Sequence, residues 1–481
     1  MKELKFGHKK LYIAGELVES SNNDTVNVVN PADEQVCATV AWATKEDTLK
    51  ALGSAQAGFE VWSQMSVDER NVWINKLRDK LIENEVLLRE SIMFEMGKNW
   101  HVTAEDFKSI TDSLKYYSEE IKNRKDIDIK DIDGTHEHRM VSQPLGVAAA
   151  FLAYNFPLLN LGFKLGPALA AGCSIILKPS EFSPLSAYII GELAHEIGFP
   201  KGVITVLCGD TPDVGIPLCE STIPRLITMI GSTGTAQKLI EQSSKTSIKR
   251  YSMECGGNAP FIVFDDANLE AAVDLGAGMK LYNSGQICVA PNRYFVHEDV
   301  IDNFTDGLAE KFKNARIGFA REDNPDIGPL ANKQSVEKVQ SIVEEAVAQG
   351  GKIVTGGKAL GQPGTYYEPT AIRLTNPKAE VLQREIFGPV SIIVPFRTKE
   401  EVLELANDTD AGLASYVFTE DLELQKFFSD KLEFGEVQLN GAKYDIYLPH
   451  GGVKNSGIGH DCSPYALDDY LIKKRVSRSL K

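Results

Sequence analysis

The run Val147-Ala148-Ala149-Ala150-Phe151-Leu152-Ala153-Tyr154 opens the part of the chain that decides the fold. It is continuously apolar, as expected for a strand that is buried on both faces of a sheet. Alternating strands and helices downstream predict βαβ units with right-handed crossovers, and therefore a Rossmann-like parallel sheet. The later apolar runs are 175–177, 203–208, 226–230 and 260–264, and the helical patterns between them are 161–171, 185–197, 213–220 and 235–242.

The region before this run predicts short strands at 11–13 and 26–29, and then a long helical stretch over 45–122. Charged and apolar residues alternate over 126–130, and a turn at Asp133-Gly134 leads into a second strand. This pattern predicts a hairpin with one thin apolar face. Because an isolated hairpin is only marginally stable, we expect it to lean on another subunit or domain.

The composition excludes several classes of protein. A chain of 481 residues predicts two or three domains, and 43% hydrophobic with 25% charged residues is typical of a globular protein. The net charge of −16 argues against a general nucleic-acid binder. We expect no membrane span, no signal peptide and no zinc site, because the apolar runs are too short and the spacings C-x-x-C and H-E-x-x-H do not occur. Seven cysteines without regular spacing indicate a reducing compartment, and we expect a cytoplasmic protein.

A second stretch, Tyr282-Asn283-Ser284-Gly285-Gln286-Ile287-Cys288-Val289-Ala290, places a cysteine in a tight loop between a helical pattern and an apolar run. A structural cysteine usually lies among aliphatic residues inside an element. A nucleophilic thiolate needs access and nearby dipoles, which a loop provides. The position of Cys288 favours a nucleophile, although the loop alone does not decide between the two.

Four further loops lie where strands of the predicted sheet end, and ligands bind to such sheets at that edge. Each has a structural alternative. Asn155 aims its amide into a cleft or is a turn residue. Lys178 and Glu181 bind a ribose diol or form a solvated charge pair. Ser232 opens a helix that binds a pyrophosphate or is simply capped. Glu254 is a functional carboxylate or a member of a salt bridge. The fingerprints G-x-G-x-x-G and Walker A do not occur.

The motifs occur in a fixed order that resembles the NAD(P)-dependent aldehyde dehydrogenase superfamily. They are Asn155-Phe156-Pro157, Lys178-Pro179-Ser180-Glu181, Gly231-Ser232-Thr233, Glu254-Cys255-Gly256-Gly257 and Asn283-Ser284-Gly285-Gln286-Ile287-Cys288. The resemblance covers nearly the whole chain, since it continues through Glu385-Ile386-Phe387-Gly388-Pro389 and Gly451-Gly452-Val453-Lys454-Asn455-Ser456-Gly457.

The resemblance implies a catalytic role for four residues. Cys288 would attack the aldehyde to form a thiohemiacetal, and a thioester would remain after hydride leaves for the nicotinamide. Asn155 and the backbone N–H of Cys288 would stabilise the oxyanion. Glu254 would activate the water that hydrolyses the thioester. Lys164, with Asp461, matches positions that some members use in proton relay, and the alternative is a pair of surface charges.

The resemblance also implies a dinucleotide cofactor. Lys178 and Glu181 would bind the adenosine ribose, and Ser232 the pyrophosphate. Glu385 and Phe387 would hold the nicotinamide ribose and ring. A carboxylate at Glu181 repels a 2′-phosphate, so NAD is expected. NADP is the second choice, because a rotated Glu can accommodate the phosphate.

The substrate side departs from the family pattern. His450 replaces the Phe of the usual Pro-Phe-Gly-Gly, and we expect it to contact a polar substrate group, with a solvent-facing loop histidine as the alternative. Phe163 and Tyr282 stand where succinate-semialdehyde dehydrogenases carry Arg. A small polar or hydroxy aldehyde such as lactaldehyde or glycolaldehyde is therefore expected. The alternatives are a succinate-semialdehyde-type dehydrogenase, a non-catalytic NAD-binding relative and a thiol esterase without redox chemistry.

By the same resemblance, an NAD-binding domain takes 1–122 and 144–254, and a catalytic α/β domain takes 255–455. An oligomerisation arm of β structure takes 123–143 and 456–481. Homodimers or homotetramers are expected.

Overall fold

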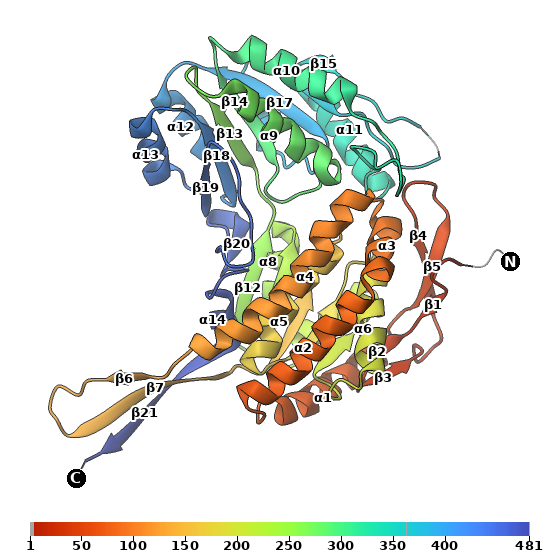
Figure 1. The fold of residues 1–481 in the computed structure, drawn as a ribbon, viewed down its shortest axis with the longest axis vertical. Helices are drawn as coiled ribbons and strands as arrows, with labels where there is room; N and C mark the ends of the chain where they lie inside the picture. Colours follow the sequence, from red (N-terminus) through yellow and green to blue (C-terminus); the bar gives the residue numbers. More distant parts are fainter. Residues whose placement is uncertain (1–3, 362, 481) are drawn as a thin grey trace.

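Two β-sheets, each covered by helices, form the two lobes seen in Figure 1, and a narrow arm of strands extends from one of them. The computed structural model describes residues 4–361 and 363–480. Within these ranges, no helix combines the length and the apolar character that crossing a lipid bilayer requires. The predicted α/β class, with a Rossmann-like parallel sheet, is confirmed.

The first sheet has eight strands, and its five central strands run parallel. The apolar runs predicted as strands from 147 to 230 all lie here, because a parallel strand covered on both faces needs no polar alternation. In spatial order the strands are β20 (Gly457–Ile458), β12 (Arg250–Cys255), β11 (Pro224–Gly231), β8 (Val147–Phe151), β9 (Ser174–Lys178), β10 (Ile204–Val206), β2 (Leu11–Ile13) and β3 (Glu16–Val18).

Helices pack on the first sheet in two groups. One group contains α1 (Lys45–Trp62), α7 (Ile216–Glu220) and α8 (Thr233–Ser244), and the other α2 (Val67–Glu83), α3 (Glu85–Met96), α4 (Trp100–Glu120), α5 (Pro157–Ala171) and α6 (Leu185–Glu196). Capping boxes at Thr44 and Ser66 begin α1 and α2, and Gly97 ends α3 with φ 73°. The strand order reverses between β8 and β11, so the carboxyl ends of these strands diverge and leave a crevice for a ligand.

The second sheet has seven strands, parallel except at one edge. The run 260–264 was predicted within the Rossmann-like series, but it belongs to this sheet, because a buried parallel strand has the same pattern in either sheet. In spatial order the strands are β15 (Lys352–Thr355), β16 (Thr370–Arg373), β17 (Val390–Phe396), β14 (Pro291–His297), β13 (Ala259–Val263), β18 (Ala414–Phe418) and β19 (Glu436–Leu439). The helices are α9 (Leu269–Leu281), α10 (Ile301–Asn314), α11 (Lys333–Ala348), α12 (Lys399–Asn407) and α13 (Leu422–Lys431).

The arm is a three-stranded antiparallel sheet (Figure 1). The two strands of the predicted hairpin are β6 (Ile127–Ile129) and β7 (His136–Pro144), and β21 (Leu471–Ser479) pairs along the length of β7. The short helix α14 (Ala466–Tyr470) leads into β21. A further small sheet near the N-terminus contains β1 (His8–Lys9), β5 (Val36–Ala41) and β4 (Thr25–Val29).

The chain crosses between the two large sheets twice. It leaves the first sheet after β12, through Gly256–Asn258, and returns to it at β20. Ser456 ties the crossings together, because its hydroxyl donates a hydrogen bond to the carbonyl of Gly256 at 2.9 Å and accepts one from the N–H of Gly412 at 2.8 Å. The space beside this junction is the site described next.

Candidate active site

A cleft of about 1230 Å³ lies beside the junction of the two sheets, and residues from both sheets line it. Its walls include the carboxyl ends of β8, β9, β11 and β12, together with the loop that carries Cys288. All but one of the predicted site residues line the cleft: Cys288, Glu254, Asn155, Lys178, Glu181, Ser232, Glu385, Phe387, His450, Phe163 and Tyr282. The exception is Lys164. Lys164 reaches this site through Asp461, which does line the cleft.

The loop before Cys288 is held in an unusual backbone conformation. Asn283, Ser284 and Gly285 all have left-handed φ, at 48°, 55° and 69°. A Cβ at Gly285 would lie 2.3 Å from the carbonyl oxygen of Gly388, so no larger residue fits there. Gln286 closes the turn, because its side chain donates to the carbonyl of Asn283 at 3.1 Å and accepts from the N–H of Ala331 at 3.0 Å.

This strained turn presents the thiol to the cleft. Of the seven cysteines, all of which the structure describes, Cys288 alone is half-exposed and the other six are buried. Gly257 packs directly under the loop, since a Cβ there would lie 2.6 Å from the carbonyl oxygen of Cys288. The accessible loop cysteine has the exposure that a nucleophile requires.

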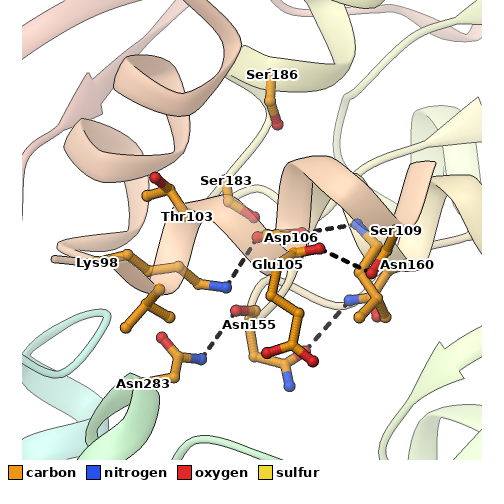
Figure 2. A network of polar contacts seen from close by, with 12 residues as sticks. Lys98, Thr103, Glu105, Asp106, Ser109, Asn155, Asn160, Ser183, Ser186 and Asn283 are labelled. Atoms are coloured by element: carbon orange, nitrogen blue, oxygen red, sulfur yellow. Dashed lines mark hydrogen bonds and ion pairs between the residues drawn. The ribbon is translucent and has the colours of Figure 1, made fainter. Parts of the chain in front are cut away.

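The amide of Asn155 lies against the same loop. Its Nδ2 donates to the carbonyl of Gln286 at 3.0 Å, and its Oδ1 accepts from Asn160 at 3.2 Å. Asn283 in turn donates to the backbone carbonyl of Asn155 at 3.0 Å (Figure 2). An amide nitrogen carries two protons, so Asn155 keeps one donor for a group in the cleft.

A buried ion pair lies next to the loop that carries Asn155 (Figure 2). Lys98 and Asp106 lie 2.8 Å apart with fully buried side chains, and the ammonium of Lys98 stands 3.4 Å from the ring centroid of Phe156. Asp106 also accepts the N–H of Leu159 at 2.7 Å, in the first turn of α5. Because no side chain of its own caps α5, the carboxylate of Asp106 performs that role and fixes the loop that carries Asn155.

Glu254 is the penultimate residue of β12, and its carboxylate has no partners in the described part of the chain. Its side chain is buried, and neither of its oxygens has a hydrogen-bond partner within the described residues. Burial, reinforced by the charge of Asp461, raises the pKa of Glu254 well above its usual range. The salt-bridge alternative for Glu254 is therefore wrong, and both of its oxygens are free to bind a water molecule.

Lys164 and Asp461 form a second buried pair, at 2.6 and 2.8 Å. Their side chains are 0% and 3% exposed, so the alternative of two surface charges is wrong. The backbone of Asp461 pairs with that of His450 through two hydrogen bonds, at 2.9 and 2.7 Å. These two backbone hydrogen bonds hold the Lys164–Asp461 pair next to His450 at one wall of the cleft.

His450 is not the solvent-facing residue that the alternative predicted. Its side chain is 16% exposed, and its Nδ1 lies 2.7 Å from Oε1 of Glu436, a residue that the sequence motifs did not reveal. Phe163 and Tyr444 pack around the imidazole, with ring centroids at 6.3 and 6.4 Å. The expected contact with a polar substrate group stays a prediction.

Tyr282 lines the cleft, but its hydroxyl is already hydrogen-bonded within the protein. Its hydroxyl donates to the carboxylate of Glu105 at 2.5 Å, near the mouth of the cleft. Two lysines, Lys108 and Lys443, and the carboxylates of Asp112 and Asp445 also line this end.

The opposite end has the groups that a dinucleotide needs. Ser232 is the N-cap of α8, and its side chain accepts the N–H of Thr235, so the capping alternative holds there while the helix N-terminus still faces the cleft. Lys178 donates a hydrogen bond to the carbonyl of Pro179 at 3.4 Å, and within the described residues neither Lys178 nor Glu181 forms an ion pair. Gly256 allows Glu385 to approach, since a Cβ there would lie 2.3 Å from Oε1 of Glu385.

Two aromatic rings, those of Phe387 and Tyr154, lie at this end of the cleft. Phe387 has a left-handed φ of 49°, and its ring meets that of Tyr154 edge-on at 5.8 Å. Burial raises the pKa of Glu385. Hydroxyls, a helix N-terminus, an unpaired ammonium and an aromatic face together fit a dinucleotide with a pyrophosphate and a flat ring.

Comparison with known proteins defines the class. The model of the aldehyde dehydrogenase family matches residues 17–476, and the chain belongs to this family. It is 38% identical over 465 residues to the mitochondrial succinate-semialdehyde dehydrogenase of Arabidopsis thaliana, covering 96% of this chain and 88% of that protein. It is 35% identical over 481 residues to a glutarate-semialdehyde dehydrogenase of Pseudomonas putida, covering 100% of both.

A solved structure of another protein has the same fold. Betaine aldehyde dehydrogenase from Staphylococcus aureus, in complex with NAD⁺, superposes with a TM-score of 0.95 at 32% identity, covering 98% of this chain and 95% of that chain. The predicted aldehyde dehydrogenase, an oxidoreductase, is therefore confirmed as the class of enzyme.

Proposed function

We propose that this enzyme oxidises an aldehyde to a carboxylic acid with NAD as the first-choice cofactor and NADP as the second. The observation that carries the proposal is that one cleft holds an accessible thiol, a partly free amide donor and a carboxylate without partners. These are the three groups that covalent aldehyde oxidation requires. A non-catalytic relative would not need Glu254 buried and unpaired.

In this proposal, Cys288 attacks the aldehyde carbon, and Asn155 donates a hydrogen bond to the oxygen that becomes negative. A bound nicotinamide supplies the hydride acceptor. Glu254 then takes a proton from the water that attacks the thioester, and the acid product leaves. Lys164 and Asp461 carry that proton away from Glu254 toward the wall of the cleft.

Lys178 and Glu181 would bind the adenosine ribose, and the N-terminus of α8 at Ser232 would bind the pyrophosphate. Glu385 and Phe387 would hold the nicotinamide half. The preference for NAD is supported by Glu181, which is exposed at the carboxyl end of β9 where a 2′-phosphate would meet its charge.

The substrate that we propose is the semialdehyde of a short dicarboxylic acid. The expected small hydroxy aldehyde, such as lactaldehyde, is not supported by the relatives, which act on succinate and glutarate semialdehydes. In place of arginines at Phe163 and Tyr282, this chain has Lys108 and Lys443 in the lining of the cleft. The ammonium of Lys108 is paired with Asp112, so we assign the distal carboxylate to Lys443. A second candidate is a cationic aldehyde, favoured by the carboxylates Glu105, Asp112 and Asp445 in the same region.

A panel of aldehydes tests this proposal through NADH formation. Succinate and glutarate semialdehydes should exceed propanal in kcat/KM by about tenfold or more, since a charge-assisted hydrogen bond contributes roughly 1.5–3 kcal/mol. Betaine aldehyde as the best substrate would select the second candidate. Glycolaldehyde as the best substrate would overturn both. Cys288→Ala is the control and should form no NADH.

We also propose the domain boundaries predicted above and a homo-oligomer assembled through the arm. The arm presents apolar side chains to solvent, among them Ile127, Ile129 and Val476, at 58%, 41% and 46% exposure. Such side chains on a three-stranded sheet favour burial against another copy. The seven free cysteines support the cytoplasmic location.

A further inference from the structure

Lys280 is a buried lysine that none of the proposed steps uses. It lies near the end of α9, its side chain is 0% exposed, and it does not line the cleft. Within the described residues it forms no salt bridge, and its Nζ donates to two neutral oxygens, Oδ1 of Asn292 at 3.2 Å and the carbonyl of Gly388 at 3.4 Å. Burial lowers the pKa of Lys280 to about 7. Such burial costs stability, and both acceptors belong to segments next to the reacting groups.

The bond to Gly388 lies between two functional loops. Gly388 follows Phe387, which is expected to hold the nicotinamide ring. Its carbonyl oxygen also accepts the N–H of Val390 at 2.9 Å, so Lys280 takes the second lone pair. The same oxygen faces the loop that carries the thiol, because a Cβ at Gly285 would lie 2.3 Å from it. Lys280 therefore fixes a carbonyl on which both loops depend.

The bond to Asn292 leads to the segment under the nucleophile. Asn292 accepts from Lys280 through Oδ1 and donates through Nδ2 to the carbonyl of Gly257 at 3.4 Å. Gly257 belongs to the crossing between the two sheets, and a Cβ there would lie 2.6 Å from the carbonyl oxygen of Cys288. Asn292 thus connects Lys280 to the backbone that packs against Cys288.

The positive charge of Lys280 also acts on Glu385, the residue expected to hold the nicotinamide ribose. Burial raises the pKa of Glu385, and the charge of Lys338, the N–H of Gly257 and the charge of Lys280 oppose that rise. An ionised carboxylate accepts stronger hydrogen bonds from hydroxyl groups than a neutral one does. Lys280 therefore favours the form of Glu385 that binds a ribose.

We propose that Lys280 is a positioning residue that holds the loop of Cys288 and the loop of Phe387 at a fixed separation. It acts through the carbonyl of Gly388 and through Asn292, without touching aldehyde or cofactor. The geometry that hydride transfer requires between the carbon bound to the sulfur and the nicotinamide ring depends on these two loops. The inference rests on the proposed function, because it takes Glu385 and Phe387 to hold the nicotinamide half.

The variant Lys280→Met tests the inference, because it removes both donors and keeps an unbranched side chain of similar length. Calorimetric titration measures its affinity for the preferred dinucleotide without aldehyde. Rapid mixing with the best aldehyde of the panel measures the single-turnover rate of hydride transfer from the absorbance of the reduced cofactor. Affinity and rate should each fall by about tenfold, since a hydrogen bond to a charged group contributes on that scale. KM for the aldehyde should stay within about twofold, because the substrate end of the cleft does not depend on Gly388.

A second variant and a matched control separate positioning from stability. Asn292→Leu has a similar volume and breaks only the connection to Gly257, so hydride transfer should slow while dinucleotide affinity stays within about twofold of the wild type. Lys249→Met is the control, because Lys249 is also buried, donates to a carbonyl and a hydroxyl, those of Ser221 and Ser247, both at 2.6 Å, and does not line the cleft. It should lower the thermal midpoint and leave affinity and hydride transfer unchanged.

The inference is overturned if a folded Lys280→Met has the dinucleotide affinity and the hydride-transfer rate of the wild type, or if Lys249→Met loses as much of both. If Lys280→Met does not fold, an Asn292→Leu variant with the wild-type rate overturns it. In each case turnover by the wild type would leave the proposed function intact. Conversely, a wild type that oxidises no aldehyde of the panel would refute the proposed function, and the dinucleotide affinity of Lys280→Met would still test the inference.

Discussion

Replacing Lys98 by Met should destabilise the first lobe and slow the chemistry together. Lys98 and Asp106 are both fully buried, so Lys98→Met leaves the charge of Asp106 without its cation, although the N–H of Leu159 still donates to it. Removing one partner of a buried pair typically costs about 3–5 kcal/mol. At roughly 2–4 °C per kcal/mol for a domain of this size, the thermal midpoint should fall by about 6–20 °C.

Thermal unfolding monitored by circular dichroism measures this fall, and kcat measured with the best aldehyde should fall with it, because Asp106 fixes the loop of Asn155. Lys201→Met is the matched control, since Lys201 and Glu16 also lie 2.8 Å apart but are 74% and 52% exposed. Its cost should stay below about 1 kcal/mol. The double variant Lys98→Met/Asp106→Asn should recover much of the loss, because it removes both charges and keeps an acceptor for α5. A Lys98→Met midpoint within about 2 °C of the wild type would refute this reasoning.

Four further predictions concern the chemistry and the choice of cofactor. Asn155→Ala should lower kcat by about 10²–10³ with little change in the thermal midpoint, and a kcat within about fivefold of wild type would contradict the oxyanion role. Glu254→Gln should keep a burst of roughly one NADH per site and then stall, with a steady rate ~10²–10⁴ lower, and rapid-mixing absorbance that lacked the burst would contradict the role in hydrolysis. Burial raises the pKa of Glu254, so the ionised form that acts as a base appears only as pH rises. The hydrolysis step of the wild type should therefore slow as pH falls through that raised pKa. This pH dependence should vanish in Glu254→Gln. Glu181→Ala should shift the ratio of kcat/KM for NADP over NAD upward by about tenfold, and an unchanged ratio would remove Glu181 from the ribose site.

The main architecture was predictable because its signals are local. The strands of the first sheet are apolar runs such as 147–154, and the loop motifs follow them directly, so the places of Asn155 and Glu254 at strand ends follow from the order of the residues alone. The strand pattern alone placed the run 260–264 in the Rossmann-like series, although the expected catalytic domain already included it, because a short apolar strand gives no sign of which strands it pairs with.

The supporting groups were not predictable, because they act across the fold. Lys98 and Asp106 belong to no motif, and only the packing of α4 on α5 brings Asp106 to Leu159. Glu436 looks like one polar residue of a short strand, and folding alone brings it to His450. Lys164 and Asp461 are 297 residues apart, so their burial as a pair could not be read from either segment.

The two crossings between the lobes, joined through Ser456, place covalent connections at the reaction centre itself. Gly256 follows Glu254 by two residues, and Gly257 underlies the carbonyl of Cys288. The lobes are also bonded at a second place, because Asn99 donates to the carbonyl of Pro325 at 2.9 Å and Thr365 donates to that of Pro31 at 3.1 Å. With attachments at two places, the relative position of the sulfur and the base is set by the whole interface between the lobes and not by one flexible loop.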